Sequence, residues 1–167
     1  MKQLTLIRHA KSSWSDQSLG DFDRPLNARG LGDAPRMGAH LKESAMSPVD
    51  RILSSPALRA RTTAELIAEK LGLASGSIIL ERLIYGASLR ELFELVCALD
   101  DSHEHVLMVG HNPGFEQLAY ALDPGFKGDG EKFPTCGVAH MKLATERWSG
   151  VEEGCATECH FVYPKGL

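Results

Sequence analysis

The stretch Leu4-Thr5-Leu6-Ile7-Arg8-His9-Ala10 places an arginine and a histidine directly after a short apolar run. The same arrangement occurs twice more along the chain. Ile52-Leu53-Ser54-Ser55-Pro56 is followed by Arg59, and Val106-Leu107-Met108-Val109 leads into Gly110-His111-Asn112-Pro113. Short apolar runs bounded by turn residues are typical of buried strands. Because ligands bind beyond the carboxyl ends of strands in an open α/β sheet, we expect these basic groups to share one crevice.

Length and composition predict a single domain over residues 1–167 of the chain. The apolar content of 43% and charged content of 24% are ordinary for a globular protein. A net charge of −4 argues against a general nucleic-acid surface, which requires a basic face. The apolar runs are too short to span a membrane or to form a secretory signal. We therefore expect a cytoplasmic protein without nucleic-acid or membrane partners.

The four cysteines do not indicate a disulfide framework or a metal site. Disulfides are rare in cytoplasmic proteins of this size. Cys155, Cys159 and His160 lie close together in the sequence, but no second pair of ligands completes a tetrahedron. Alternation around residues 157–163 fits a strand better. We expect no metal and no cofactor.

Apolar periodicity and turn signals divide the chain into alternating strands and helices. Strands are expected over residues 2–8, 50–54, 77–80, 105–109, 137–143 and 157–163. Helices are expected over residues 27–43, 56–71, 88–99 and 113–122. Strands alternating with helices predict an α/β fold, a three-layer sandwich with a mostly parallel central sheet and an antiparallel edge from the last two strands.

Four helix starts carry capping signals. Asn27 and Ser88 are expected to be N-caps, the latter in a capping box with Glu91. Ser55 before Pro56 and Asn112 before Pro113 combine an N-cap residue with a proline at the first helical position. The loop over residues 123–135 is rich in glycine, proline and charge, and the sequence leaves open whether it borders the crevice.

The basic groups after the strands suit a phosphoryl group, which carries about two negative charges near neutral pH. Arg8 and Arg59 have planar guanidinium forks that match two phosphate oxygens at once, and the two helix N-termini favour an anion. His9 is the candidate nucleophile, since a neutral imidazole attacks phosphorus to form phosphohistidine. His111 is the candidate donor to the equatorial oxygens. Each residue alone has an ordinary structural explanation, and the inference depends on their coincidence at three strand ends.

These motifs resemble those of the histidine phosphatase superfamily, which includes the phosphoglycerate mutases. Arg8-His9-Ala10 is similar to its Arg-His-Gly signature, with Ala10 in place of the glycine. The stretch from Ser54 to Ala64 resembles the second motif of the superfamily, and Gly110-His111 resembles the third. The short chain looks most like the SixA-type phosphohistidine phosphatase branch. The resemblance implies a phosphoglycerate mutase-like fold, with His9 as phosphate acceptor and Arg8, Arg59 and His111 around the phosphate.

The remaining site predictions concern substrate binding and a proton donor. Ser12 and Asn112 complete the expected substrate-binding set. Most of the superfamily uses a carboxylic acid to protonate the leaving oxygen, and Glu81 is the candidate here, with Asp16, Asp21 and Asp23 as weaker candidates. The other explanation of Glu81 is a surface carboxylate beside Arg82.

Imidazole is a far better leaving group than an alkoxide, so phosphohistidine needs little acid assistance. The sequence therefore favours a phosphatase that removes phosphate from phosphohistidine-containing proteins, without a metal. Two alternatives stay open. The first is a phosphatase of small phosphate monoesters, which requires Glu81 or another acid. The second is a catalytically silent phosphate-binding module.

Overall fold

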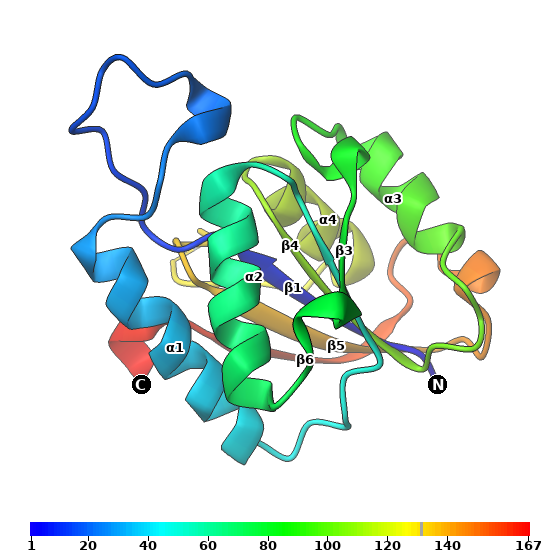
Figure 1. Cartoon of the computed structure of the whole chain (residues 1–167). Helices are drawn as coiled ribbons and strands as arrows, with labels where there is room; N and C mark the ends of the chain where they lie inside the picture. The colour runs from blue at the N-terminus through cyan, green and yellow to red at the C-terminus, as the bar shows by residue number, and fades with distance from the viewer. Residues whose placement is uncertain (131) are drawn as a thin grey trace.

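A six-stranded sheet forms the centre of the computed structural model (Figure 1), which describes residues 1–130 and 132–167. The strands are β1 (Gln3–Arg8), β2 (Arg51–Ser54), β3 (Ile78–Leu80), β4 (His105–Gly110), β5 (Val138–Leu143) and β6 (Ala156–Val162). Their order across the sheet is β3-β2-β4-β1-β5-β6. Strands β1 to β4 pair in parallel, whereas β5 runs antiparallel to β1 and β6 antiparallel to β5. The expected mostly parallel sheet with an antiparallel pair at its edge is confirmed.

The register of the central strands brings the candidate residues together. Arg8 at the end of β1 pairs with Gly110 at the end of β4, and Ser54 at the end of β2 pairs with Val109. The chain segments that carry His9 and His111 therefore leave the sheet side by side. This register places the three motifs, which are distant in the sequence, next to one another.

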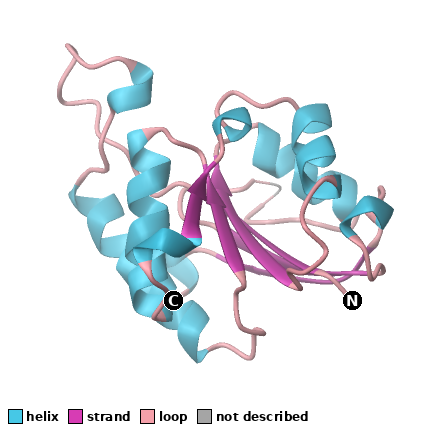
Figure 2. Cartoon of the chain, turned by 45° about the vertical axis from the view of Figure 1, so that its right-hand side comes forward, coloured by secondary structure: helices cyan, strands magenta, loops and turns pink. Residues whose placement is uncertain are grey.

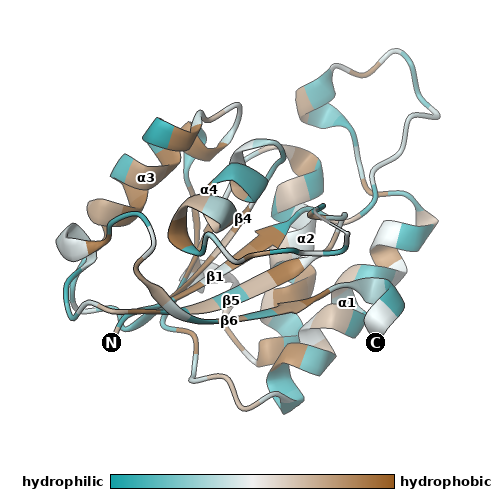
Figure 3. Ribbon diagram, turned by 180° about the vertical axis from the view of Figure 1, so that it is seen from behind, coloured by the Kyte–Doolittle hydropathy of each residue, from teal (hydrophilic) through white to brown (hydrophobic). Residues whose placement is uncertain are grey.

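Four α-helices cover the two faces of the sheet: α1 (Ala28–Glu43), α2 (Leu58–Leu71), α3 (Leu89–Cys97) and α4 (Gly114–Leu122). Helices α1 and α2 lie on one face, and α3 and α4 lie on the other (Figure 2). The apolar positions of β4, β1 and β5 stand out in brown between these helices (Figure 3). The three-layer architecture is confirmed. Among the described residues, no helix has both the length and the apolarity to cross a membrane.

Two of the four expected helix caps are confirmed. The Asn27 side chain accepts a hydrogen bond from the Gly30 N–H at 2.9 Å, and helix α1 follows. Ser88 and Glu91 form the expected reciprocal capping box at the start of α3. Both caps satisfy backbone N–H groups that have no partner within their helix.

The other two cap predictions are wrong. Helix α2 begins at Leu58 after Ala57, and α4 begins at Gly114 after Pro113. Ser55 instead hydrogen-bonds a histidine ring, and the Asn112 amide donates to the carbonyl of Phe133 at 2.9 Å. Tertiary partners have thus taken the side chains that local sequence assigns to capping.

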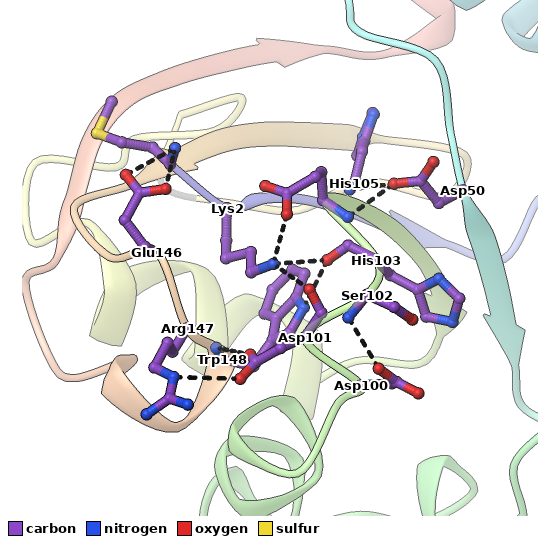
Figure 4. A network of polar contacts seen from close by, with 12 residues as sticks. Lys2, Asp50, Asp100, Asp101, Ser102, His103, His105, Glu146, Arg147 and Trp148 are labelled. Carbon is purple, nitrogen blue, oxygen red and sulfur yellow. Dashed lines mark hydrogen bonds and ion pairs between the residues drawn. The ribbon is translucent and has the colours of Figure 1, made fainter.

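A buried lysine stabilises the edge of the sheet at which β1 begins (Figure 4). The Lys2 ammonium donates to the carbonyl oxygens of Asp101 and His103 at 2.7 and 3.0 Å. It also donates to the Glu104 carboxylate at 2.8 Å. These contacts tie β1 to the turn before β4. They lie at the opposite end of β1 from His9, so their role is structural.

We predict that Lys2→Met lowers the free energy of unfolding by about 1–3 kcal/mol, because the Asp101 carbonyl loses the Lys2 donor, the His103 carbonyl keeps only that of Trp148, and the Glu104 carboxylate loses its cation. Urea denaturation measures this change. Lys42→Met, at an exposed position in the last turn of α1, is the matched control and should change stability little. Equal stability of the two variants would contradict the structural role of Lys2.

Candidate active site

The candidate site lies at the edge of the sheet where β1 and β4 end. His9 follows β1 and His111 follows β4, and the centroids of their rings are 5.3 Å apart. Arg59, in the first turn of α2, and Arg8, the last residue of β1, both lower the pKa of His9 through their charge. All four residues that the sequence singles out therefore lie in one cluster.

His9 is held as a neutral ring with one free nitrogen. Its Nδ1 lies 2.7 Å from the carbonyl oxygen of Ala10, which only accepts, so the ring proton sits on Nδ1. Burial lowers the pKa of His9 to about 3, opposed by this backbone bond and reinforced by the charges of His111, Arg59 and Arg8. The Nε2 lone pair is thus unprotonated at neutral pH, as a nucleophile requires.

His111 is oriented by a serine. Its Nε2 lies 2.7 Å from the Ser55 hydroxyl, which also accepts a hydrogen bond from the Ala57 N–H at 3.3 Å. When this hydroxyl donates to Nε2, neutral His111 carries its own proton on Nδ1. Burial, followed by the charge of Arg59, lowers the pKa of His111 to about 4. The edge of the Tyr85 ring packs against it, with centroids 5.5 Å apart.

The two arginines are anchored by different parts of the chain. Arg59 donates from both terminal nitrogens to Asp21, one bond going to the carbonyl oxygen and one, 3.0 Å long, to the carboxylate. Arg8 donates to the carbonyl oxygen of Phe133 at 3.0 Å. Burial lowers the pKa of Arg8, although a guanidinium stays charged at neutral pH. Both cations are therefore oriented before any ligand arrives.

Asp21 connects most of these side chains. Its carboxylate accepts hydrogen bonds from the Tyr85 hydroxyl at 2.7 Å, from Arg59, and from Arg24 at 3.3 Å. The hydrogen bond from Tyr85 is the largest cause that lowers the pKa of Asp21 to about 2. Asp21 is consequently ionised at neutral pH and holds no proton to donate as an acid.

Several buried polar atoms in this cluster have no hydrogen-bond partner among the described residues. They are Arg8 Nε, Arg59 Nε and His111 Nδ1, together with one acceptor atom, Asn112 Oδ1. A buried N–H without an acceptor is costly, and native structures contain few of them. Their concentration here indicates a position where acceptor atoms of a bound group would be favourable. A tetrahedral oxyanion carries such acceptors.

The remaining predicted site residues have defined positions. The Ser12 hydroxyl accepts a hydrogen bond from Arg24 at 2.8 Å, so it contacts the cluster through that arginine. The Glu81 carboxylate accepts from the Leu83 N–H at 3.1 Å and caps the short 3₁₀ helix η3 (Arg82–Ile84). The role of Glu81 as a proton donor stays a prediction.

The sequence did not assign four contributors to the phosphate pocket: Asp21 and Arg24 from the long polar loop, Tyr85 directly after η3, and the carbonyl of Phe133 from the loop over residues 123–135. It named Asp21 only as a weaker candidate acid. The spacing of Asp21 and Arg24, three residues apart with opposite charges, was the usable signal for their pairing. The loop over residues 123–135 does border the site, although residue 131 lies outside the described residues.

A metal centre is not apparent. Among residues 1–130 and 132–167, no group of three or more histidine, cysteine, aspartate or glutamate side chains lies in a position to hold a metal ion. The site's positive charge comes instead from the two arginines, and Arg24 adds a third guanidinium nearby.

Comparison with known proteins places this geometry in a family. Residues 4–84 match the model of the histidine phosphatase superfamily (branch 1). The chain is 36% identical to the uncharacterized protein Rv1276c of Mycobacterium tuberculosis over 95% of this chain and 100% of that one. It is 30% identical to the uncharacterized chloroplastic protein At3g52155 of Arabidopsis thaliana, over 88% of this chain and 69% of that one.

Solved structures agree with the sequence comparison. The structure of the protein histidine phosphatase SixA complexed with tungstate has a TM-score of 0.75 to this chain, at 25% identity, over 96% of this chain and 94% of that one. The chain belongs to the histidine phosphatase superfamily. Its fold is that of the SixA structures, as the resemblance of its motifs implies.

The lowered pKa of His9 predicts a specific dependence of stability on pH. Above pH 6.5 the group is neutral in the folded and unfolded chain and has no effect. Between pH 6.5 and about 3 only the unfolded chain binds the proton, so the free energy of unfolding falls as the pH falls. When the pH is lowered from 7 to 5, we expect the free energy of unfolding to fall by about 1–2 kcal/mol less in His9→Asn than in the parent protein.

Urea denaturation at pH 7 and pH 5 tests this expectation. His40→Asn replaces an exposed histidine in α1 and serves as the control. Its loss of stability between the two pH values should match that of the parent protein. A parallel loss in the parent and in His9→Asn would show that His9 is not held neutral by the fold.

Proposed function

We propose that this protein is a phosphohistidine phosphatase that hydrolyses phosphohistidine in proteins through a covalent phosphoenzyme intermediate on His9, without a metal. The observation that carries the proposal is the state of His9. It is a buried, neutral imidazole whose Nδ1 is bound to the Ala10 carbonyl and whose Nε2 is unprotonated beside His111 and two arginines. This is the arrangement that nucleophilic attack on a phosphoryl group requires.

In the first step, the Nε2 lone pair of His9 attacks phosphorus in line with the substrate nitrogen. A bond forms between His9 and phosphorus while the bond between phosphorus and the substrate imidazole breaks. The electron pair of the broken bond stays with the departing imidazole. Arg8 and Arg59 balance the charge on the equatorial oxygens, and the Nδ1–H of His111 donates to one of them.

In the second step, a water molecule attacks the phosphoryl group on His9. The new bond joins the water oxygen to phosphorus, and the electron pair of the broken P–N bond returns to Nε2. The water proton goes to the phosphate or to solvent. Inorganic phosphate leaves and His9 is again neutral. The hydrogen bond to the Ala10 carbonyl keeps the ring proton of His9 on Nδ1 throughout. Nε2 is therefore the reacting atom in both steps.

The carboxylates near the site support phosphohistidine as the substrate. Asp21 is ionised and engaged by Arg59, Arg24 and Tyr85, and Glu81 caps η3. Asp21 therefore holds no proton for an alkoxide, and one Glu81 oxygen is engaged by the Leu83 N–H. A phosphohistidine ring protonated on its other nitrogen departs as neutral imidazole and needs no such donor. The similarity to a SixA protein histidine phosphatase points to the same substrate class.

The rim of the site suits a protein rather than a small metabolite. Three large apolar side chains on segments next to site residues are exposed: Trp14 at 69%, Leu83 at 54% and Leu31 at 51%. They belong to the loop after β1, which carries Asp21 and Arg24, to η3, which precedes Tyr85, and to the first turns of α1. Exposed apolar side chains favour contact with another protein surface.

A panel of substrates tests the proposal. We expect efficient release of phosphate from a phosphohistidine protein, slow release from phosphoserine peptides and phosphoglycerate, and no effect of EDTA. His9→Asn should lower kcat by at least about 10³-fold, because the nucleophile is gone. A strong preference for phosphoglycerate would favour a metabolite phosphatase, and binding without turnover would favour a silent phosphate-binding module.

Glu81→Gln separates the two enzymatic possibilities. The substitution preserves the oxygen that caps η3 but removes the acidic proton. We expect kcat/KM for phosphohistidine to change less than about threefold, because the leaving imidazole needs no acid. A loss of about 10²-fold or more on phosphate esters alone would identify Glu81 as the acid of an ester phosphatase.

A further inference from the structure

A second cavity, of about 390 Å³, adjoins the candidate active site. It shares a wall with that site, because Arg8 precedes His9 and Asn112 follows His111 in the chain and both line it. Its other walls come from the start of α1 and from the loop over residues 123–135. Neither His9 nor His111 lines the cavity, which adjoins the proposed phosphoryl position through Arg8.

The cavity walls carry four cationic side chains and two carboxylates. The cations are Arg8, Lys11, Arg29 and Lys132, and the carboxylates are Glu116 and Asp129. The chain as a whole has a net charge of −4. A local excess of positive charge in an acidic protein is therefore a feature of this cavity and not of the surface in general.

The two carboxylates already have partners. Glu116 accepts a hydrogen bond from the Phe133 N–H at 2.8 Å and lies within electrostatic reach of Arg8. The charge of Asp129 raises the pKa of the Tyr163 phenol, so this carboxylate faces Tyr163. Both are thus committed to holding the loop over residues 123–135 in place.

The two lysines have no such partners. Among the described residues, neither Lys11 nor Lys132 forms an ion pair, and both side chains are exposed. Arg29 pairs with Asp33 at 3.4 Å and is half-exposed. Among the described lining residues, the cavity therefore carries two ammonium groups that are not engaged in an ion pair, beside Arg8.

The backbone of Lys11 is held firmly against α1. The Asn27 N–H donates to the Lys11 carbonyl oxygen at 3.0 Å. A Cβ atom at Gly30 would lie only 2.2 Å from that same oxygen, so only glycine allows this close approach. The Lys11 backbone is consequently fixed two residues after His9, beside the helix turn that carries Arg29.

We propose that this cavity binds a carboxylate side chain of the protein substrate, so that the enzyme selects phosphohistidines flanked by aspartate or glutamate. The inference rests on the function proposed above. A polar cavity whose described lining has four cationic side chains and two carboxylates attracts an anionic partner and orients it as it approaches. The exposed side chains of Trp14, Leu31 and Leu83, on segments next to site residues, favour an anion carried by a protein over one carried by a small metabolite.

Two phosphohistidine peptides of the same length provide the test, one with aspartates flanking the phosphohistidine and one with asparagines. Phosphoramidate serves as a substrate without flanking groups. For the parent protein, we expect kcat/KM to be about tenfold higher for the aspartate peptide, mainly through KM. The preference should shrink as the salt concentration rises from 50 to 500 mM, because salt screens exposed charges.

The double variant Lys11→Gln, Lys132→Gln should remove most of this preference. We expect the ratio of kcat/KM between the aspartate and asparagine peptides to fall about tenfold, toward one. Lys42→Gln, on an exposed position at the far end of α1, should keep the ratio of the parent protein. Thermal unfolding of each variant verifies that the fold is intact.

The outcomes separate the two proposals. If both peptides are hydrolysed equally well by the parent protein at low salt, the cavity does not bind a substrate carboxylate. The proposed phosphohistidine phosphatase activity is then still supported. If neither peptide is hydrolysed while a phosphate ester is, both proposals fail. If the lysines instead control the KM of phosphoglycerate, the cavity takes a metabolite carboxylate and the inference is overturned.

Discussion

The hydrogen bond between His9 Nδ1 and the Ala10 carbonyl is the interaction on which the proposed chemistry depends. It assigns the ring proton to one nitrogen and leaves the other as a lone pair. Burial contributes the rest, because desolvation disfavours the charged imidazolium and lowers the pKa of His9 to about 3. A surface histidine with the usual pKa would be partly protonated at neutral pH and free to change tautomer. The fold therefore fixes both the protonation state and the tautomer of His9.

Asp21 performs the corresponding task for the cations. Its carboxylate and carbonyl together hold Arg59, and its contacts with Tyr85 and Arg24 link the long loop after β1 to η3. Arg24 also stacks on Trp14, with the guanidinium carbon 3.5 Å from the ring centroid. The loop is therefore ordered by the charges it brings to the site. An anion that enters the site would meet an Arg59 already held by Asp21.

The two ends of the sheet have different roles. At one end, the buried Lys2 ammonium satisfies carbonyl groups and stabilises the turn before β4. At the other, Arg8, Arg59 and His111 have polar atoms without a hydrogen-bond partner among the described residues. A protein tolerates such unsatisfied groups where a ligand completes them. The contrast separates the buried lysine, whose contacts are structural, from the arginines of the candidate site.

The sequence by itself determined the α/β fold, the sheet with its antiparallel pair, and the convergence of Arg8, His9, Arg59 and His111. Strand periodicity and the shared edge of parallel strands are local and topological rules, so a single sequence contains them. Only the tertiary structure decided what Ser55, Asn112 and Asp21 do. Local sequence assigns the first two to helix caps, yet one orients His111 and the other binds Phe133, because partners distant in the chain lie closer than the helix N–H groups. Side-chain partners across loops depend on packing, which no spacing rule contains.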